Sequence, residues 1–242
     1  MKGAPASRAK LTGAVSETAL FFLFSFLAFL FSISVHESAH ALVADRCGDP
    51  TARLLGRISL NPIRHIEIFG TVVLPLITFF SGLPTFGWAK PTPVVPSKFR
   101  HPRRDDMLVS VAGPVSNLLT AVVCLAALLA IRATSQEGAR IVEELSFVGK
   151  TGLEGSALIP VAAILYRLLV VSVILGIFNM LPVPPLDGSH ILSQLLPPRA
   201  RDLYRSASRY GFMILLIVMW YTPLDTWIFD RPMRLFNSLL RM

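Results

Sequence analysis

The sequence predicts an all-α polytopic membrane protein, organised as a three-helix core with a re-entrant hairpin and a C-terminal helix. Two observations support this fold class. The chain of 242 residues is 53% hydrophobic and only 16% charged, whereas a typical soluble domain is about 25% charged. Its apolar residues also gather in uncharged runs that are long enough to cross a bilayer as helices. We therefore expect one integral membrane domain over residues 1–242.

Four runs are the expected membrane helices, and they cover residues 18–44, 107–131, 164–181 and 208–222. The first follows a short basic tail. No A-x-A-type cleavage site comes after it, so we expect it to be retained rather than removed as a signal peptide. In the third run, Arg167 falls in the first turn, from which its long side chain can reach the headgroup region.

The first run contains the pattern His36-Glu37-Ser38-Ala39-His40. In a helix, residues four positions apart lie on one face, so His36 and His40 can bind one metal ion. Glu37 lies beside them, where it can exchange a proton with a water molecule at the metal. The pattern also occurs by chance in helices. Inside a membrane-spanning segment, however, a strongly polar group costs about 2.5–3.5 kcal/mol on insertion scales. This cost favours a functional reason for its presence.

A catalytic zinc site needs a third protein ligand beside two histidines. Asp187 is the best candidate in the sequence, because it follows the third membrane run directly and lies behind the proline-rich turn 182–185. Gly188 comes next and allows the backbone to approach closely. The alternative role for Asp187 is that of an ordinary aspartate in a turn or at a helix end.

If Asp187 binds the same metal, the helices that end near Ala44 and Leu181 must run in the same direction. A single crossing by the apolar segment 68–84 would place Asp187 on the wrong face. We therefore expect this segment to enter and leave on one side, as a re-entrant hairpin with Pro75 at its middle. Irregular backbone at this depth must be covered by protein or water, so the hairpin should lie beside the metal site.

Asn117 is a polar side chain within the second run, near the same end as the metal pattern. Two roles are open for it. It can pair with another helix, which is worth about 0.6 kcal/mol, or it can donate a hydrogen bond to a substrate carbonyl and to the oxyanion formed from it.

The charges of the loops indicate the orientation of the chain. The face with the metal pattern has 12 Lys and Arg residues and the opposite face has nine, which favours a cytoplasmic active site. The basic N-terminal tail argues the other way. The net charge of +8 is spread over loops, where it suits lipid headgroups, and no basic and aromatic platform for nucleic acid is present. The 12 residues are Arg46, Arg53, Arg57, Arg64, Lys90, Lys98, Arg100, Arg103, Arg104, Arg199, Arg201 and Arg205.

Taken together, these features resemble the site-2 proteases, which are intramembrane zinc metalloproteases. The resemblance is to a compact prokaryotic branch of the family without PDZ or CBS domains. The motifs that carry it are His36-Glu37-Ser38-Ala39-His40, Gly56-Arg57-Ile58-Ser59-Leu60-Asn61-Pro62, Phe86-Gly87-Trp88-Ala89-Lys90-Pro91, Gly113-Pro114-Val115-Ser116-Asn117, and the segment 178–188 that ends in Leu186-Asp187-Gly188.

The resemblance implies one zinc ion per chain, bound by His36, His40 and Asp187. It implies Glu37 as the general base and Asn117 as a catalytic residue that engages the substrate or its oxyanion. The implied function is that of a zinc-dependent endopeptidase, which cleaves a transmembrane segment of another membrane protein. The implied location is the plasma membrane of a prokaryotic cell, with the active site toward the cytoplasm.

Two other functions remain open. A membrane metal transporter would also bury histidines and acidic residues, although along several helices rather than at one depth. Another membrane metalloprotease with the same histidine pattern, such as a prenyl-protein processing enzyme, would take its further ligands from other Glu or His residues. His190, one turn after Asp187, is either a contact of the metal site or a surface residue.

Overall fold

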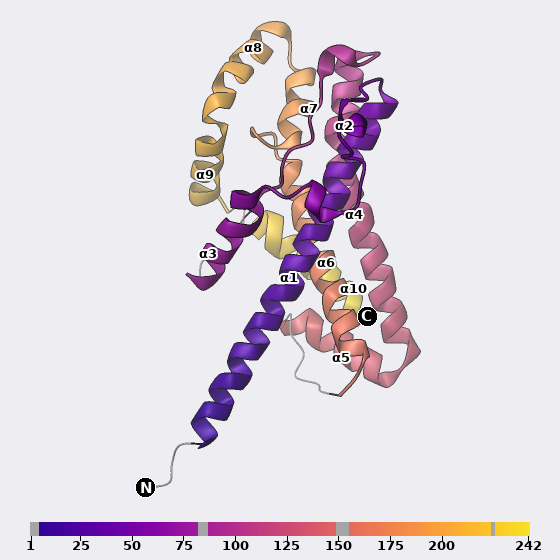
Figure 1. Cartoon of the computed structure of the whole chain (residues 1–242), viewed down its shortest axis with the longest axis vertical. Helices are drawn as coiled ribbons and strands as arrows, with labels where there is room; N and C mark the ends of the chain where they lie inside the picture. Colours follow the sequence, from indigo (N-terminus) through magenta and orange to yellow (C-terminus); the bar gives the residue numbers. More distant parts are fainter. Residues whose placement is uncertain (1–4, 82–86, 149–154, 224–225) are drawn as a thin grey trace.

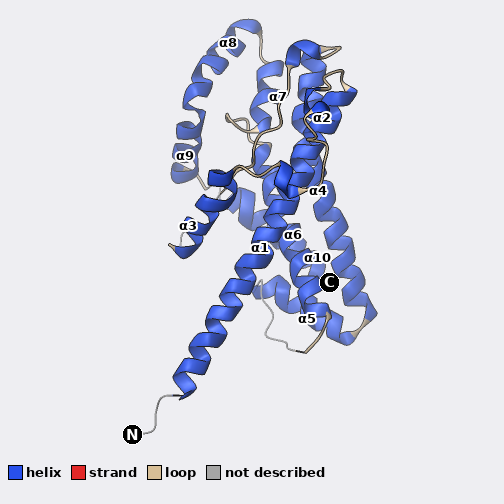
Figure 2. Ribbon diagram, in the orientation of Figure 1, coloured by secondary structure: helices blue, strands red, loops and turns tan. Residues whose placement is uncertain are grey.

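The computed structural model describes residues 5–81, 87–148, 155–223 and 226–242 (Figure 1). Within these ranges the chain consists of helices and loops, without a strand (Figure 2). Three helices are long and apolar enough to cross a membrane, namely α1 (Pro5–Arg46), α4 (Pro102–Thr134) and α6 (Leu158–Asn179). The predicted all-α membrane fold with a three-helix core is confirmed.

Helices α1 and α6 run in the same direction, and α4 runs against both. The end of α1 meets the chain just before α4, where the amide of Arg100 donates to the carbonyl of Cys47 over 3.0 Å. Inside the core, the hydroxyls of Ser32 in α1 and Ser172 in α6 lie 3.0 Å apart and are buried. Small side chains at such contacts let helices approach closely where lipid provides no hydrophobic driving force.

Helix α4 begins five residues before the predicted run. Pro102 suits the first helical position because its missing amide hydrogen would have no partner there. The carboxylate of Asp105 then accepts a hydrogen bond of 2.8 Å from the amide of His101, which closes the start of the helix. Residues 90–101, before this helix, have no helical structure apart from one 3-10 turn at Pro96–Lys98.

Helix α6 also begins earlier than predicted, and this corrects the position of Arg167. Residues 158–163 are apolar, and Pro160 lies in the first turn, where no amide donor is needed. Arg167 is thus well inside the helix rather than in its first turn. Its guanidinium lies over the ring of Phe21 in α1, 3.8 Å from the ring centroid, a favourable cation–π contact in apolar surroundings.

The far end of the core is closed by α5 (Gln136–Val148) and α10 (Arg231–Arg241). Arg132, near the end of α4, donates hydrogen bonds to the carbonyls of Leu240 and Arg241. The buried side chains that form this apolar cluster include Leu128, Ile141, Leu145, Leu169 and Leu240.

The described chain before and after residues 82–86 lies together at the base of the predicted hairpin. Its outgoing arm is a π-helical turn (Ile68–Val73) that continues into α3 (Leu74–Phe80). The returning chain bonds to the start of this arm, where the amide of Trp88 donates to the carbonyl of Gly70 over 3.1 Å and the amide of Lys90 donates to the carbonyl of His65 over 2.8 Å. The two ends of the segment therefore lie side by side, as a re-entrant hairpin requires.

The turn of the hairpin is not at Pro75, which lies in the first turn of α3. The expected hairpin also included residues 82–84, which lie outside the described residues. The base of the hairpin is tightly packed, since a Cβ atom on Gly70 would collide with the indole of Trp88.

The C-terminal part differs from the single crossing expected over residues 208–222. Helix α9 (Gly211–Tyr221) has 11 residues, which is about 17 Å of helix, whereas the hydrocarbon core is about 30 Å thick. Pro223 follows soon after and cannot continue the helix. Since Gly211 contacts Pro184 at the metal-pattern end and α10 packs at the far end, the chain passes along the core in separate pieces.

Cysteine accessibility tests the hairpin. In a chain with Cys47 and Cys124 replaced by serine, we expect Ile66→Cys and Lys90→Cys to react with an impermeant thiol reagent from the same side of sealed vesicles. Ser135→Cys, just after α4, should react from the other side and serves as the control. Labelling of residues 66 and 90 from opposite sides would exclude the hairpin.

Candidate metal centre

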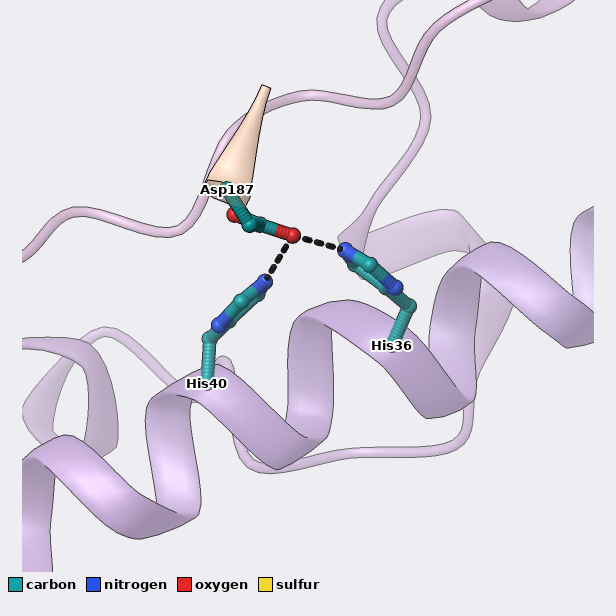
Figure 3. A group of neighbouring side chains, drawn as sticks. All are labelled: His36, His40 and Asp187. Atoms are coloured by element: carbon teal, nitrogen blue, oxygen red, sulfur yellow. Dashed lines mark ion pairs between the residues drawn. The ribbon is translucent and has the colours of Figure 1, made fainter. Parts of the chain in front are cut away.

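Three side chains from distant parts of the sequence converge near the C-terminal end of α1. His36 and His40 point from neighbouring turns of α1 toward Asp187, the first residue of α7 (Asp187–Leu195) (Figure 3). One nitrogen or oxygen ligand atom of each residue lies within 4.8 Å of the others. Among the described residues, this is the group of His, Cys, Asp and Glu side chains that could hold a metal ion.

Both histidines are held with Nε2 toward Asp187. The Nδ1 atom of His40 lies 2.7 Å from the carbonyl oxygen of Val109 in α4 and can only donate to it. His40 therefore carries its proton on Nδ1, which leaves the lone pair of Nε2 for a metal ion. The Nδ1 atom of His36 lies 3.2 Å from the side-chain amide of Asn117.

Asn117 is fully buried and faces His36. When His36 binds a metal through Nε2, its Nδ1 carries a proton and needs an acceptor. The amide oxygen of Asn117 makes no hydrogen bond within the described part of the chain, and a half-turn of the amide brings this oxygen to Nδ1. Of the two roles expected for Asn117, the structure thus displays the contact between helices.

Asp187 reaches the histidines because of the local backbone. Leu186 is extended, with φ −76° and ψ 156°, so the proline-rich turn ends at once and Asp187 begins α7. The positive end of the helix dipole favours a carboxylate at this position. Gly188 is required beside it, since a Cβ atom there would lie 2.5 Å from the carbonyl oxygen of Leu181.

The carboxylate of Asp187 is suited to a cation. Its Oδ2 atom lies 3.1 Å from Nε2 of His36 and 3.4 Å from Nε2 of His40, yet it is buried without a hydrogen bond from any described residue. A metal ion would supply the partner that Oδ2 lacks.

Gly113 in α4 leaves space at the three ligand atoms. A Cβ atom on Gly113 would lie 2.6 Å from Nε2 of His36 and would also collide with Nε2 of His40. Two imidazoles and one carboxylate are the kind of donor set that zinc takes in catalytic sites. The orphaned Oδ2 atom, the fixed protonation of His40 and the space beside Gly113 all fit a bound zinc ion.

Glu37 lies outside this group and faces a cavity. The cavity has a volume of about 480 Å³, and its lining includes His36, Glu37, Trp88 and Pro185 but not Asn117. The Oε2 atom of Glu37 accepts hydrogen bonds of 2.7 Å from both the amide and the hydroxyl of Thr92. Glu37 is thus beside the ligands and open to a space in which a substrate could lie.

The sequence did not point to Gly113 or Thr92 as parts of the site. Gly113 stands in a recognised motif, but its closeness to the imidazoles depends on how α4 packs on α1. Thr92 is flanked by Pro91 and Pro93, which signals only an extended loop. His190 lies away from the ligands, with Nδ1 3.9 Å from Oδ1 of Asp106 and a largely exposed side chain.

Comparison with known proteins finds one family. The model of peptidase family M50 matches residues 24–221 of the chain. YwhC of Bacillus subtilis is 34% identical over 223 residues, which covers 89% of this chain and 91% of YwhC. Rip2 of Mycolicibacterium smegmatis is 28% identical over 212 residues, covering 86% of this chain and 71% of Rip2. Both are named provisionally as zinc metalloproteases. No solved structure matches the chain.

Zinc content tests the three ligands. We expect purified wild-type protein to hold about one zinc ion per chain, because two imidazoles and one carboxylate leave one position for water. His36→Ala, His40→Ala and Asp187→Ala should each lose most of it, as measured by inductively coupled plasma mass spectrometry. His190→Ala is the matched control and should keep the metal. Full zinc content in Asp187→Ala would exclude Asp187 as a ligand.

A second variant tests the space beside the ligands. We expect Gly113→Ala to lose zinc, because its methyl group would occupy the position that the metal and the imidazoles share. Gly176→Ala is the control, since its new methyl group would meet only the movable side chain of Leu118 and the carbonyl of Pro114. It should retain zinc. Full zinc content in Gly113→Ala, equal to that of Gly176→Ala, would show that Gly113 does not border the metal.

Proposed function

The chain belongs to peptidase family M50, and we propose that it cleaves a peptide bond within a transmembrane segment of another membrane protein. Its family makes it a zinc metalloendopeptidase. Its three long apolar helices make it an integral membrane protein. The observation that carries the proposal is the meeting of Asp187, at the start of α7, with His36 and His40 on the membrane-spanning α1, next to an apolar cavity.

In this proposal His36, His40 and Asp187 hold the zinc ion. When bound, zinc supplies Lewis acidity toward a water molecule and toward the scissile carbonyl. His40 is fixed by its bond to Val109, and His36 by Asn117, so both rings keep Nε2 toward the centre. We assign Asn117 this positioning role on the contact that it makes, and an additional contact with the substrate or its oxyanion stays a prediction.

Glu37 is the proposed general base. Both hydrogen bonds from Thr92 go to its Oε2 atom, which leaves Oε1 to take a proton from the attacking water. Glu37 then passes this proton to the nitrogen of the leaving amine. The helix holds Glu37 next to His36, and this neighbouring position brings the carboxylate to the cavity without a further conformational change.

The substrate would lie along an apolar path. The cavity at Glu37 adjoins a second cavity of about 300 Å³ between α1, α3 and α6, which is lined largely by apolar side chains. The residues that line both cavities are Phe29, Gly87, Leu175 and Phe178. Such a surface suits the apolar side chains of a membrane-spanning segment, and the lipid bilayer supplies that segment from the side.

A helical substrate must unwind before it can be cut, because its carbonyl groups are hydrogen-bonded within the helix. Residues 87–95 form a loop without regular secondary structure, which lies against Glu37 through Thr92. An extended peptide can pair with such a loop through backbone hydrogen bonds, in the manner of strand addition. We propose that this loop holds the unwound stretch, and that the active site opens toward the cytoplasm from the plasma membrane of a prokaryotic cell.

The position of the candidate metal ligands also argues against a function in metal transport. A transporter needs ligands along a path across the bilayer, whereas the described part of the chain has one metal-binding group, at one end of the core. The relatives that match over most of this chain are named as metalloproteases, not as transporters. A prenyl-protein processing activity has no support of its own in the described structure.

Glu37→Gln tests the proposed mechanism. We expect the variant to keep about one zinc ion per chain, because no ligand changes, and to cleave a reconstituted single-span substrate about 10²- to 10⁴-fold more slowly, the range that general acid–base catalysis supplies. Zinc content and cleavage would be measured on the same preparation. Undiminished cleavage would exclude Glu37 as the base.

A further inference from the structure

Thr92 has two hydrogen-bond donors, its amide and its hydroxyl, and both are directed at Glu37. Its amide and its hydroxyl both lie 2.7 Å from Oε2 of the carboxylate, and the hydroxyl lies 3.0 Å from the backbone carbonyl of Glu37. Hydrogen bonds to a charged group are shorter and stronger than neutral ones. A glutamate side chain rotates about three bonds, so these contacts restrict a carboxylate that would otherwise adopt several positions.

The loop that carries Thr92 is fixed on both sides. Before it, the amide of Lys90 donates to the carbonyl of His65, and Thr71 donates to the carbonyl of Trp88 over 2.7 Å. After it, the amide of Val95 donates to Oδ2 of Asp49 over 2.7 Å. Prolines on either side of Thr92 limit its backbone further.

Arg57 connects this loop to the segment before the hairpin. Its side chain is buried, and its guanidinium donates to the carbonyls of Arg64, Lys90 and Pro91. Burial lowers the pKa of Arg57, while the nearby charge of Glu37 raises it, and a guanidinium remains charged under such conditions. The motif around Arg57, to which the proposed mechanism gave no role, thus holds the two residues that precede Thr92.

We propose that Thr92 is a positioning residue for catalysis, which fixes Oε2 of Glu37 so that Oε1 faces the reacting water, and that Arg57 holds the loop for this purpose. The proposal rests on the function proposed above, because it assigns Glu37 as the base. The hydrogen bonds of Thr92 within the described part of the chain go to Glu37 and not to His36, His40 or Asp187. Its effect should therefore fall on the rate of the chemical step and not on metal binding.

Kinetics of Thr92 variants provide the first test. We expect Thr92→Val, which has nearly the same shape but no hydroxyl, to lower kcat by roughly 10- to 100-fold, the range for one hydrogen bond to a charged group. KM should change less than about twofold and zinc content not at all, because only the orientation of the base is altered. Thr92→Ser should restore most of kcat, since serine keeps the hydroxyl.

Thr78→Val is the matched control. Thr78 is a buried threonine in α3 whose hydroxyl, among the described residues, bonds to the carbonyls of Leu74 and Pro75 in its own helix. The same change there should leave kcat near the wild-type value. Equal losses in Thr78→Val and Thr92→Val, or no recovery in Thr92→Ser, would show a general effect on packing and would overturn the proposal.

Amide hydrogen exchange gives a second readout that needs no activity. In zinc-free protein, we expect the Thr92 amide to exchange roughly 10- to 100-fold faster in Glu37→Ala than in the wild type, because its acceptor is gone. Pro91 and Pro93 have no amide, so a peptide over residues 90–95 reports few other positions. The amides of Lys90 and Val95 have other acceptors and should not change. Unchanged exchange at Thr92 would contradict the contact.

The two proposals can fail separately. If Glu37→Gln retains full cleavage, the proposed mechanism is wrong and the role of Thr92 loses its basis. If Glu37→Gln is inactive with zinc bound while Thr92→Val keeps the wild-type kcat, the mechanism stands and the positioning role is excluded. Should Thr92→Val fail to fold, as judged by zinc loss, Thr92→Ser and the exchange measurement on Glu37→Ala decide between these outcomes.

Discussion

Much of the chain is arranged around one contact, in which the carboxylate of Asp187 lies between the imidazoles of His36 and His40. A charged oxygen buried at the end of an apolar core is costly unless a cation accompanies it. To bring it there, α1 and α6 must run in parallel, α4 must offer a glycine at the contact, and the proline-rich turn must end at Leu186. The direction of the chain, the packing of α4 and the local turn thus serve one contact.

The hairpin and the loop after it supply what the three-helix core lacks. The candidate metal ligands come from α1 of the core and from α7, but the core helices present few free backbone groups to a substrate. The returning chain at residues 87–95 is not helical. It lies against Glu37 through Thr92 and lines the cavity with Trp88 and Pro91. Arg57 and Thr71 tie this loop to the base of the hairpin. A single folded-back segment therefore shapes the cavity and holds the proposed base.

Local patterns in the sequence were sufficient for some predictions and misleading for others. The three long helices are confirmed, because apolar length is a property of neighbouring residues. Asp187 lies beside the two histidines, as a shared metal would require, and the role of the three residues as ligands stays a prediction. The prediction that Arg167 lies in a first helical turn is wrong, because α6 begins at Leu158 and not at residue 164. We expected one membrane crossing over residues 208–222, whereas α9 has 11 residues. A run of apolar residues does not show how much of it will form one helix.

By itself, the sequence determined the membrane class, the three spans, the two histidines on one helical face, and the demand that a late carboxylate join them. Three features are visible only in the folded chain. Val109 and Asn117 contact the imidazoles, and Gly113 leaves room beside them. Thr92 donates hydrogen bonds to Glu37. These partners are separated by 55 to 81 positions in the chain. No local period encodes such a separation, and the contacts arise when helices and a folded-back loop pack together.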